Sequence, residues 1–400
     1  GSEMTARRAI VFLAIGETIY WAGLYYIFAA LLVQWEAAEP WPKTLITMAF
    51  TGAILMAAIF APIAGRQIDR GNGPKVLSFA ALIGATLVAL LPFANSVWIF
   101  GAIWLGVGAC LGGCLYETCF SLITRTRGDN ARRDITLVTL FAGLAGTLSF
   151  PLSNTISDAY GWHTAIWTMA GLVAFVGVPL VWHATSFLEK EYQKENATRD
   201  DEATSIHSPT FNIRSVLAKP AFWFIAIGFA MLGSNHGVII NHILPILTDR
   251  GLTGDAAVLA ASMIGPMQVA GRLAMMSAES RVSSHAITSA CFVGVACAGI
   301  ALYFSPVVPA LVVTFVILQG SSHGVTSIMR PVITKEILGT QNFGAISGAV
   351  AVPYLLAWAA APLAGSLLWE AGGYDLAILV VIASALIGLL FYRAAVHYSY

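Results

Sequence analysis

Four charged residues interrupt the long apolar runs of this sequence, namely Glu17, Glu117, Arg272 and Arg330. A carboxyl group among apolar neighbours can take up a proton, because burial disfavours its charged form. An arginine keeps its charge and offers paired N–H donors to a carboxylate. The residue types therefore predict proton uptake at one of the two glutamates and anion binding at the arginines.

Each of these residues also has a structural interpretation, which the sequence leaves open. A buried glutamate can be held by a hydroxyl group, an arginine or a break in a helix. An arginine near a helix end can reach lipid headgroups, and Pro331 places Arg330 near such an end. Glu117 and Arg330 could also pair as a gate between two halves of the protein.

Histidines form a second group of candidates. His236 and His242 follow Asn235 and Asn241 in one apolar run, where nearby glycines could bend the helix, and His323 lies in a later run. Histidine titrates near neutral pH and can relay protons, although in a membrane it can equally serve as an interhelical hydrogen-bond partner. The six-residue spacing of His236 and His242 places them on different helix faces, so we expect no metal site and no cofactor.

Aromatic and amide side chains complete the set of candidate binding residues. We expect Tyr25, Asn154 and Tyr354 to line a solute cavity, because Tyr25 lies deep in its run and Tyr354 follows a proline. The alternative is that the aromatic rings anchor helix ends at the membrane interface.

The composition identifies the environment of these residues. Hydrophobic residues make up 58% of the 400 residues and charged residues only 10%, with a mean hydropathy of +0.76. Soluble domains carry about 25% charged residues, so the chain is expected to face lipid. The net charge of zero excludes nucleic acid as an expected partner. The sequence contains no hydrolase elbow, nucleotide loop or metal motif, so we do not expect an enzyme.

The apolar runs predict twelve membrane-spanning helices, since roughly 20 apolar residues cross a ~30 Å hydrocarbon core. They lie near residues 9–34, 44–65, 76–94, 97–123, 135–157, 164–185, 221–247, 256–276, 285–303, 308–331, 343–368 and 375–396. The predicted fold is an all-α integral membrane protein with two six-helix halves. The predicted organisation is an N-terminal bundle (1–185), a cytoplasmic linker (186–220) and a C-terminal bundle (221–400).

The distribution of Lys and Arg predicts the orientation, because cytoplasmic loops carry the excess of these residues. Most of them precede the first run, follow even-numbered runs or lie in 186–220, which leaves Lys43 and Arg250 for the other side. Both termini are therefore expected in the cytoplasm, in a multi-pass protein of the inner (cytoplasmic) membrane.

Three features of the first half recur in the second at a nearly constant offset of roughly two hundred residues. Gly65-Arg66 corresponds to Gly271-Arg272, Arg125 to Arg330, and Pro151 to Pro362. Parallel six-helix repeats of this kind place a solute site near the middle of the membrane, between the halves.

The loop after the second run reads Gly65-Arg66-Gln67-Ile68-Asp69-Arg70-Gly71-Asn72-Gly73-Pro74-Lys75. It resembles the signature of the major facilitator superfamily, with its second glycine displaced by one position and only Lys75 left of the trailing bases. The resemblance implies that Gly65 allows close helix approach. It also implies that Asp69, paired with Arg70 or a neighbouring base, latches the halves on the cytoplasmic side. The second copy, 271–281, is more degraded, so the latch is expected in the first half.

The run Gly16 to Tyr26, together with Gly271-Arg272, is most similar to the monocarboxylate-porter-like branch of this superfamily. This resemblance implies a monomeric symporter of a small organic anion and protons that works by alternating access. Arg272 would hold the anion, and Glu17 or Glu117 would carry the proton. One alternative is an antiporter that exports a metabolite, drug or toxic compound, with purely structural arginines. Another is a solute-sensing receptor or a channel on the same fold.

Overall fold

The computed structural model describes residues 2–198, 212–278, 280–339 and 343–399. The chain divides into two compact units, Gly1–His207 (the N-terminal unit) and Ser208–Tyr400 (the C-terminal unit). Both consist of helices, and the described residues contain no strand. This confirms the predicted all-α membrane fold.

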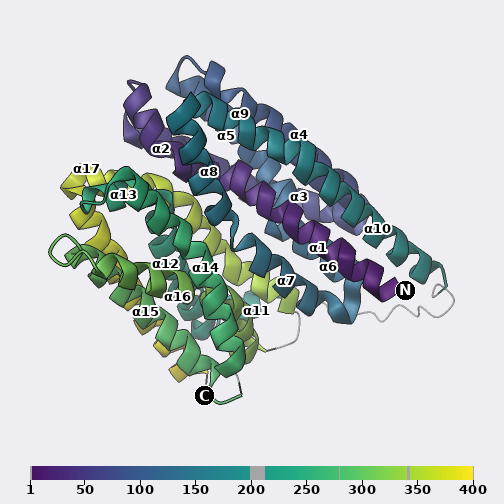
Figure 1. Cartoon of the computed structure of the whole chain (residues 1–400). Coiled ribbons are helices and arrows are strands. Elements are labelled where there is room, and N and C mark those ends of the chain that lie inside the picture. The colour runs from purple at the N-terminus through teal and green to yellow at the C-terminus, as the bar shows by residue number, and fades with distance from the viewer. Residues whose placement is uncertain (1, 199–211, 279, 340–342, 400) are drawn as a thin grey trace. The chain divides into compact units, whose positions relative to one another are not determined.

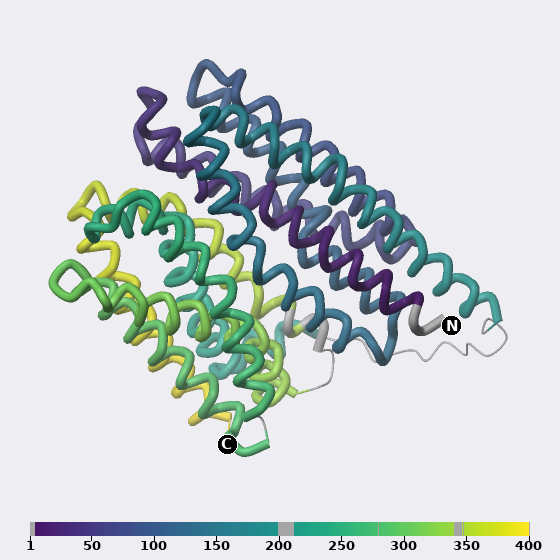
Figure 2. The backbone as a smooth tube through the Cα atoms, viewed as in Figure 1, coloured from purple at the N-terminus to yellow at the C-terminus, as the bar shows by residue number. Residues whose placement is uncertain are grey.

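The N-terminal unit is coloured purple to teal in Figure 1. Its helices are α1 (Ser2–Tyr20), α2 (Tyr26–Ala38), α3 (Lys43–Asp69), α4 (Gly73–Ala89), α5 (Val97–Cys114), α6 (Tyr116–Arg127), α7 (Ala131–Ala142), α8 (Ala145–Tyr160), α9 (Trp162–Leu172) and α10 (Val178–Ala197). Short π-helical or 3₁₀ segments join some of them: η1 (Trp21–Tyr25), η2 (Leu91–Phe93), η3 (Gly128–Asn130) and η4 (Val173–Gly177). Helices α7 and α8 run alongside α1 and α2, as the backbone trace in Figure 2 also shows.

The C-terminal unit is coloured green to yellow in Figure 1. It contains α11 (Ile213–Leu217), α12 (Pro220–Asn241), α13 (Ile243–Asp249), α14 (Gly254–Ala278), α15 (Ser284–Phe304), α16 (Leu311–Leu338) and α17 (Phe343–Tyr398). Its main packing partners are α12 with α17, and α14 and α15 with α16.

Ten helical stretches of the described residues are long and apolar enough to cross a membrane. Two of them, Val97–Tyr160 and Gly348–Tyr398, have 64 and 51 residues, and each is long enough for two crossings. The first turns at η3, where Gly128 has φ +51°, and the second turns where Gly373 has φ +71°. Counting each of these twice gives the twelve crossings that the apolar runs predict.

Local sequence sets several of the helix ends. Ser96 and Ser283 cap α5 and α15, because each hydroxyl accepts the backbone N–H three residues ahead at 3.2 Å. Gly161 and Gly339 stop α8 and α16 with φ values of +93° and +92°, which side chains with a Cβ rarely adopt.

The predicted linker, 186–220, is partly helical. Helix α10 continues to Ala197, and α11 occupies Ile213–Leu217. Residues 199–211 lie outside the described part of the chain.

Pairs of glycines allow the same helix crossing in both units. In the N-terminal unit, Gly108 and Gly112 of α5 face the backbone of α3, and a methyl group at Gly112 would lie 2.6 Å from the Ala57 carbonyl oxygen. In the C-terminal unit, Gly320 and Gly324 of α16 face the backbone of α14 in the same way. Small residues four apart let membrane helices approach closely. The internal repeat therefore extends to this crossing.

Gly65 does not have the packing role predicted for it within its own unit. A methyl group at Gly65 would meet no atom within 4 Å. Gly71 lies in the following turn with φ +87°, so the conformational need for glycine falls there.

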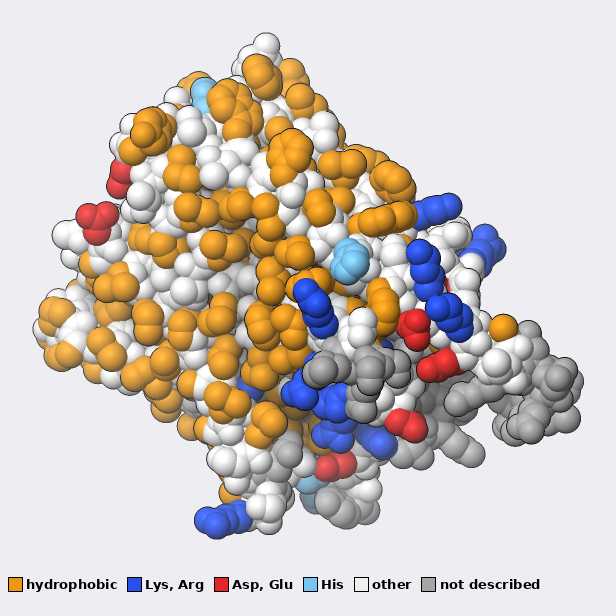
Figure 3. Space-filling model, turned by 45° about the vertical axis from the view of Figure 1, so that its right-hand side comes forward, with side chains coloured by type: hydrophobic (Ala, Val, Ile, Leu, Met, Phe, Trp, Pro, Cys, Tyr) orange, Lys and Arg blue, Asp and Glu red, His pale blue; other side chains and the backbone are white. Residues whose placement is uncertain are grey.

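Hydrophobic side chains cover much of the face shown in Figure 3, and Lys and Arg gather toward one edge of it. Large apolar side chains such as Phe175, Val307 and Leu390 are 82%, 79% and 70% exposed. Inside the N-terminal unit, Phe28 stacks on Phe50 with ring centroids 4.3 Å apart. The exposed apolar surface is the one expected of helices that face lipid.

Candidate functional site

A break in the first membrane-spanning helix lies at η1, between α1 and α2. Here the backbone forms a π-helical turn, which interrupts the normal hydrogen bonding of an α-helix. Ser149 of α8 donates a hydrogen bond of 2.9 Å to the Ala22 carbonyl oxygen. Tyr25 is buried at the end of this turn, and its ring centroid lies 5.0 Å from that of Trp21. Such turns are frequent at functional sites.

A second break lies beside the first. Helix α5 ends at Cys114 and α6 begins at Tyr116, because Leu115 adopts an extended conformation with φ −92° and ψ −155°. The rings of Trp21 and Tyr116 lie 4.8 Å apart between centroids, so the two breaks adjoin. Irregular backbone at membrane depth is tolerated where it lines a cavity or is covered by protein.

Glu17 lies one helical turn before the η1 break and is completely buried. The Cys119 thiol, a weak donor, lies beside the carboxylate. Neither carboxylate oxygen accepts a well-formed hydrogen bond from the described residues. A buried carboxyl group without strong donors is favoured in its neutral, protonated form.

The other predicted carboxylate has different surroundings. Glu117 begins α6 with an exposed side chain, and Ser121 donates to its backbone carbonyl at 2.8 Å. Asn154 is half-buried on α8, next to the fully buried Ser153. Glu17 is therefore buried and Glu117 exposed, although nothing in the sequence distinguished them.

In the C-terminal unit three rings form a stack. His236 of α12 lies on His323 of α16 with centroids 3.5 Å apart and an interplanar angle of 3°. Trp358 of α17 lies nearly parallel to both rings, at 5.8 and 6.1 Å. Two histidines in face-to-face contact repel each other when both are charged, so a charge on one ring disfavours a charge on the other.

A chain of amide hydrogen bonds fixes the His236 ring. Asn235 donates from Nδ2 to the Val381 carbonyl at 2.9 Å, which leaves Asn235 Oδ1 as an acceptor. Gln319 Nε2 donates to that oxygen at 3.2 Å and to His236 Nδ1 at 3.0 Å. With Nδ1 as acceptor, the proton of neutral His236 sits on Nε2. His323 is half-buried, and its ring nitrogens have no hydrogen bond in the described part of the chain.

Arg330 also lies on α16, about two helical turns beyond His323. Its guanidinium carbon lies 4.1 Å from the ring centroid of Tyr354, a cation–π contact. Its Nη1 is buried, with no hydrogen-bond partner among the described residues. The stack and Arg330 share α16 and α17, because Tyr354 and Trp358 are one turn apart with ring centroids at 6.3 Å.

Arg272 of α14 is buried and contacts the same helix. Its Nε donates to the Gly324 carbonyl at 3.0 Å, and its Nη2 donates to Ser327 Oγ at 3.1 Å. These bonds hold α14 to α16 beside the Gly320/Gly324 crossing. They give Arg272 a structural contact, and anion binding by this residue stays a prediction.

The described carboxylates of the C-terminal unit are all exposed: Asp249, Asp255, Glu336, Glu370 and Asp375. Two of them bind Arg250, and a third lies 3.4 Å from His285. None of these carboxylates lies in the interior beside the stack and Arg330. Within the described part of this unit, the Arg330 guanidinium therefore has no internal carboxylate beside it.

His242 and Asn241 belong to the packing of the C-terminal unit. His242 is fully buried, with Nε2 2.8 Å from the Pro362 carbonyl oxygen and Nδ1 3.0 Å from Tyr374 Oη. Since a carbonyl can only accept, Nε2 carries the proton and Nδ1 accepts from the tyrosine. Asn241 Nδ2 donates to the Gly237 carbonyl at 2.8 Å. The two histidines of this run thus lie in separate environments.

Comparison with known proteins identifies the family of this chain. A profile of the Major Facilitator Superfamily matches residues 9–351. The chain belongs to the major facilitator superfamily. It is 23% identical over 356 residues to monocarboxylate transporter 12 of Xenopus laevis, a match that covers 82% of this chain and 76% of the relative. It is 24% identical over 288 residues to monocarboxylate transporter 12-B of Danio rerio, covering 64% and 59%. These relatives support its place in the monocarboxylate-transporter-like branch.

Solved structures of this superfamily share the fold. A bacterial homologue of the human lysosomal transporter Spinster, in an inward-facing occupied state, has a TM-score of 0.69 at 12% identity and covers 98% of this chain and 96% of that one. The nucleoside transporter NupG has a TM-score of 0.72 at 12% identity, with coverages of 98% and 99%. The human organic anion transporter MFSD10 has a TM-score of 0.67 at 14% identity, with coverages of 97% and 99%. The family and fold point to membrane transport and not to an enzyme.

The superfamily signature loop adopts a specific hydrogen-bonding arrangement. Arg125 at the end of α6 binds both carboxylate oxygens of Glu189 on α10, at 3.2 and 3.0 Å, and donates to the Asp69 carbonyl at 2.9 Å. The Asp69 side chain is exposed, and its charge interacts with that of Arg125. Within this unit Arg125 is thus a base that both Asp69 and Glu189 contact, and the latch between the halves stays a prediction.

The sequence assigned no role to several of these residues. Gln319 orients His236, Glu189 holds Arg125, and Cys119 lies beside Glu17. The repeat had already marked Arg125, and an amide inside an apolar run could have marked Gln319. Nothing in the sequence indicates the partner of Glu189, because 64 residues separate it from Arg125.

Proposed function

We propose that this major facilitator carries a small organic anion, such as a monocarboxylate, together with a proton by alternating access. Arg330, His323 and Tyr354 would contact the anion, and Arg272 would add positive charge. Glu17 would carry the proton. The observation that carries the proposal is the buried Nη1 of Arg330, which lies over Tyr354 without a hydrogen-bond partner in the described residues.

Charge supports an anion as the solute. Placing a guanidinium group inside the membrane costs about 3 kcal/mol or more unless the group is paired or hydrated. The described carboxylates of this unit are exposed, so an anionic solute would be the internal partner. The relatives named monocarboxylate transporter 12 and the fold neighbour named organic anion transporter MFSD10 agree with this choice.

Glu17 supports proton coupling. It is buried beside the η1 break, where small backbone changes can alter what its oxygens contact. Its protonation would remove a buried charge, so the two protonation states should favour different conformations of the unit. Tyr25 and Asn154 retain the predicted role of lining residues near this point. Glu117 retains the weaker alternative of a gate residue.

Uptake into proteoliposomes tests the proposal. Radiolabelled monocarboxylates would be offered with and without an imposed proton gradient. We expect gradient-driven accumulation, and Arg330→Gln should reduce apparent affinity about tenfold or more, since hydrogen bonds to charged groups contribute ~1.5–3 kcal/mol. Arg281→Gln, which changes an exposed arginine outside the helices, is the matched control. Unchanged affinity in Arg330→Gln would overturn the proposed site.

The direction of transport is tested in the same vesicles. An importer accumulates anion when the outside is acidic, whereas an antiporting exporter releases preloaded solute when protons enter. Rates that fail to saturate with solute concentration would instead indicate a channel.

The excess of Lys and Arg on one side supports our further proposal that both termini face the cytoplasm. We also propose that the protein is a monomer in the inner membrane. Protease cleavage in intact right-side-out vesicles should leave both termini protected.

A further inference from the structure

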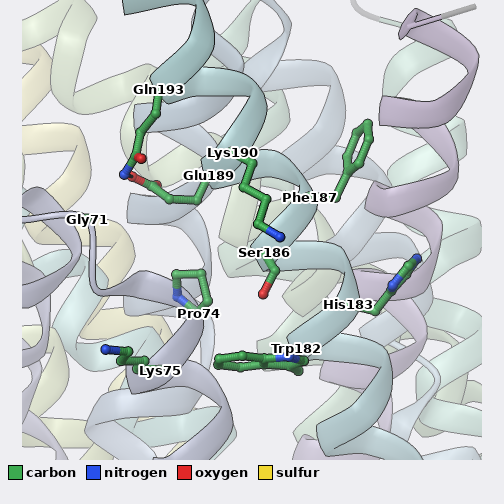
Figure 4. Close-up of a pocket in the computed structure, with 10 residues that line it drawn as sticks. All are labelled: Gly71, Pro74, Lys75, Trp182, His183, Ser186, Phe187, Glu189, Lys190 and Gln193. Carbon is green, nitrogen blue, oxygen red and sulfur yellow. Dashed lines mark hydrogen bonds between the residues drawn. The ribbon is translucent and has the colours of Figure 1, made fainter.

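A cavity of about 510 Å³ lies in the N-terminal unit, and its lining does not include Glu17 or the residues of the helix breaks. It lies between the turn that follows α3, the start of α4 and the outer part of α10 (Figure 4). Its lining residues are Gly71, Pro74, Lys75, Trp182, His183, Ser186, Phe187, Glu189, Lys190 and Gln193. The transport mechanism proposed above makes no use of it.

The cavity carries a positive charge. Lys75 and Lys190 line it from two different helices, and Figure 4 shows Ser186 next to Lys190, Trp182 below Ser186, and Pro74 between the two lysines. Glu189 is the one acidic residue of the lining, and both of its oxygens are held by Arg125 at 3.0 and 3.2 Å. The two lysines are therefore available to an anion, with the Ser186 hydroxyl as a further donor.

Aromatic side chains mark the position of the cavity in the membrane. Trp182 is 44% exposed and Phe79 is 54% exposed, and their ring centroids lie 6.4 Å apart. Tryptophan is enriched at the membrane–water interface. One side of the cavity therefore continues onto exposed apolar surface, and two lysines add ammonium groups to its lining. A ligand that fits must be anionic at one end and apolar at the other.

We propose that this cavity binds an anionic phospholipid. The headgroup phosphate would lie beside Lys190 and Ser186, with Lys75 adding positive charge at the opposite end of the lining, and an acyl chain would lie against Trp182 and Phe79. Basic recesses beside membrane helices recognise anionic headgroups in this way. Because Glu189 and Gly71 also belong to the Arg125 network, a bound lipid would brace the turn between α3 and α4.

Native mass spectrometry of the purified full chain in neutral detergent tests the proposal. Phosphatidylglycerol and phosphatidylcholine with identical acyl chains would be titrated separately. We expect at least one phosphatidylglycerol to be retained about tenfold more tightly than phosphatidylcholine. The Lys75→Gln/Lys190→Gln variant should lose this preference. Lys194→Gln is the matched control, because Lys194 lies one turn further along the same helix, 77% exposed and outside the cavity lining.

A second variant separates the cavity from general surface charge. Ser186→Trp keeps both lysines and fills the space beside Lys190, and it should weaken phosphatidylglycerol binding as strongly as the double lysine change. Thermal unfolding of each variant without lipid checks that the fold is intact. Equal retention of both lipids, a Lys194→Gln effect equal to that of the double variant, or full competition by millimolar inorganic phosphate would overturn the proposal. The last result would indicate a free-phosphate site.

Discussion

The two units share a helical frame and differ in the charged groups that it encloses. The crossing of α5 on α3 and that of α16 on α14 both depend on glycines four residues apart. In the N-terminal unit, the buried charges Lys43, Asp134 and Glu189 each have an ion-pair partner, and Glu17 has none among the described residues. In the C-terminal unit the corresponding interior holds arginines and stacked histidines.

This difference separates the residues of the repeat that helix packing requires from the polar residues that can differ between the two units. Backbone contact at the crossing leaves no room for a Cβ, so both copies of the frame must keep small residues there. The polar side chains face space that packing does not fill, and they can differ between the units. An acid in one unit and bases in the other fit a carrier that handles a proton and an anion at separate groups.

The largest expected effect tests the shared frame. Gly112→Ala and Gly324→Ala place a methyl group 2.6 and 2.5 Å from the carbonyl oxygens of Ala57 and Gln268. Each should destabilise its unit by about 3 kcal/mol or more, at the upper end of overpacking effects. Thermal unfolding in detergent and the yield of monodisperse protein measure the effect. Gly101→Ala in α5 is the control, since the nearest atom would be 3.9 Å away.

If Gly324→Ala unfolds like the unmodified protein while Gly112→Ala does not, the two crossings are not equivalent. The comparison between the units would then hold for topology and not for packing.

A second prediction tests the division of roles between the units. Glu17→Gln should reduce proton-driven accumulation more than tenfold but retain solute exchange across vesicles with equal pH, because it removes the proton carrier and leaves Arg330 intact. Counterflow and gradient-driven uptake are measured on the same preparation. Glu195→Gln, at an exposed glutamate of α10, is the control and should leave both rates within about twofold.

A third prediction separates two histidines of the C-terminal unit. His242→Phe removes two buried hydrogen bonds, with the Pro362 carbonyl and the Tyr374 hydroxyl, so it should lower stability by about 1–3 kcal/mol. His323→Phe keeps a flat ring against His236 and Trp358, so it should leave the unfolding temperature nearly unchanged while weakening solute binding severalfold. Thermal unfolding with and without solute separates the two effects. Equal destabilisation by both changes would assign His323 to packing.

The membrane-spanning helices could be predicted from the sequence, because the hydropathy of a segment and the charged residues at its ends do not depend on the rest of the fold. The sequence was not sufficient for the η1 break, because the π-helical turn is satisfied by Ser149 from another helix. It treated Glu17 and Glu117 alike, because the side of a helix that a residue faces depends on its neighbours in space.

The histidines illustrate the same limit. The six-residue spacing predicted different faces for His236 and His242, but it could not assign one to a ring stack and the other, beyond the end of α12, to helix packing. Those assignments depend on α16 and α17, which lie far along the chain. The anion site stays a prediction for the same reason.

The smallest expected effects concern the ion pairs at the ends of the units. Arg250→Gln releases Asp249 and Asp375, whose side chains are 41% and 63% exposed and remain hydrated, so the cost should be about 0–1 kcal/mol. Arg125→Gln instead leaves the Glu189 carboxylate, 6% exposed, without its bidentate partner, and should cost about 1–3 kcal/mol. The difference should appear as a larger fall in unfolding temperature for Arg125→Gln, and it should shrink when Glu189→Gln is added. A greater loss from Arg250→Gln would mean that the Arg250 cluster, and not the Arg125 network, is the stronger structural contact.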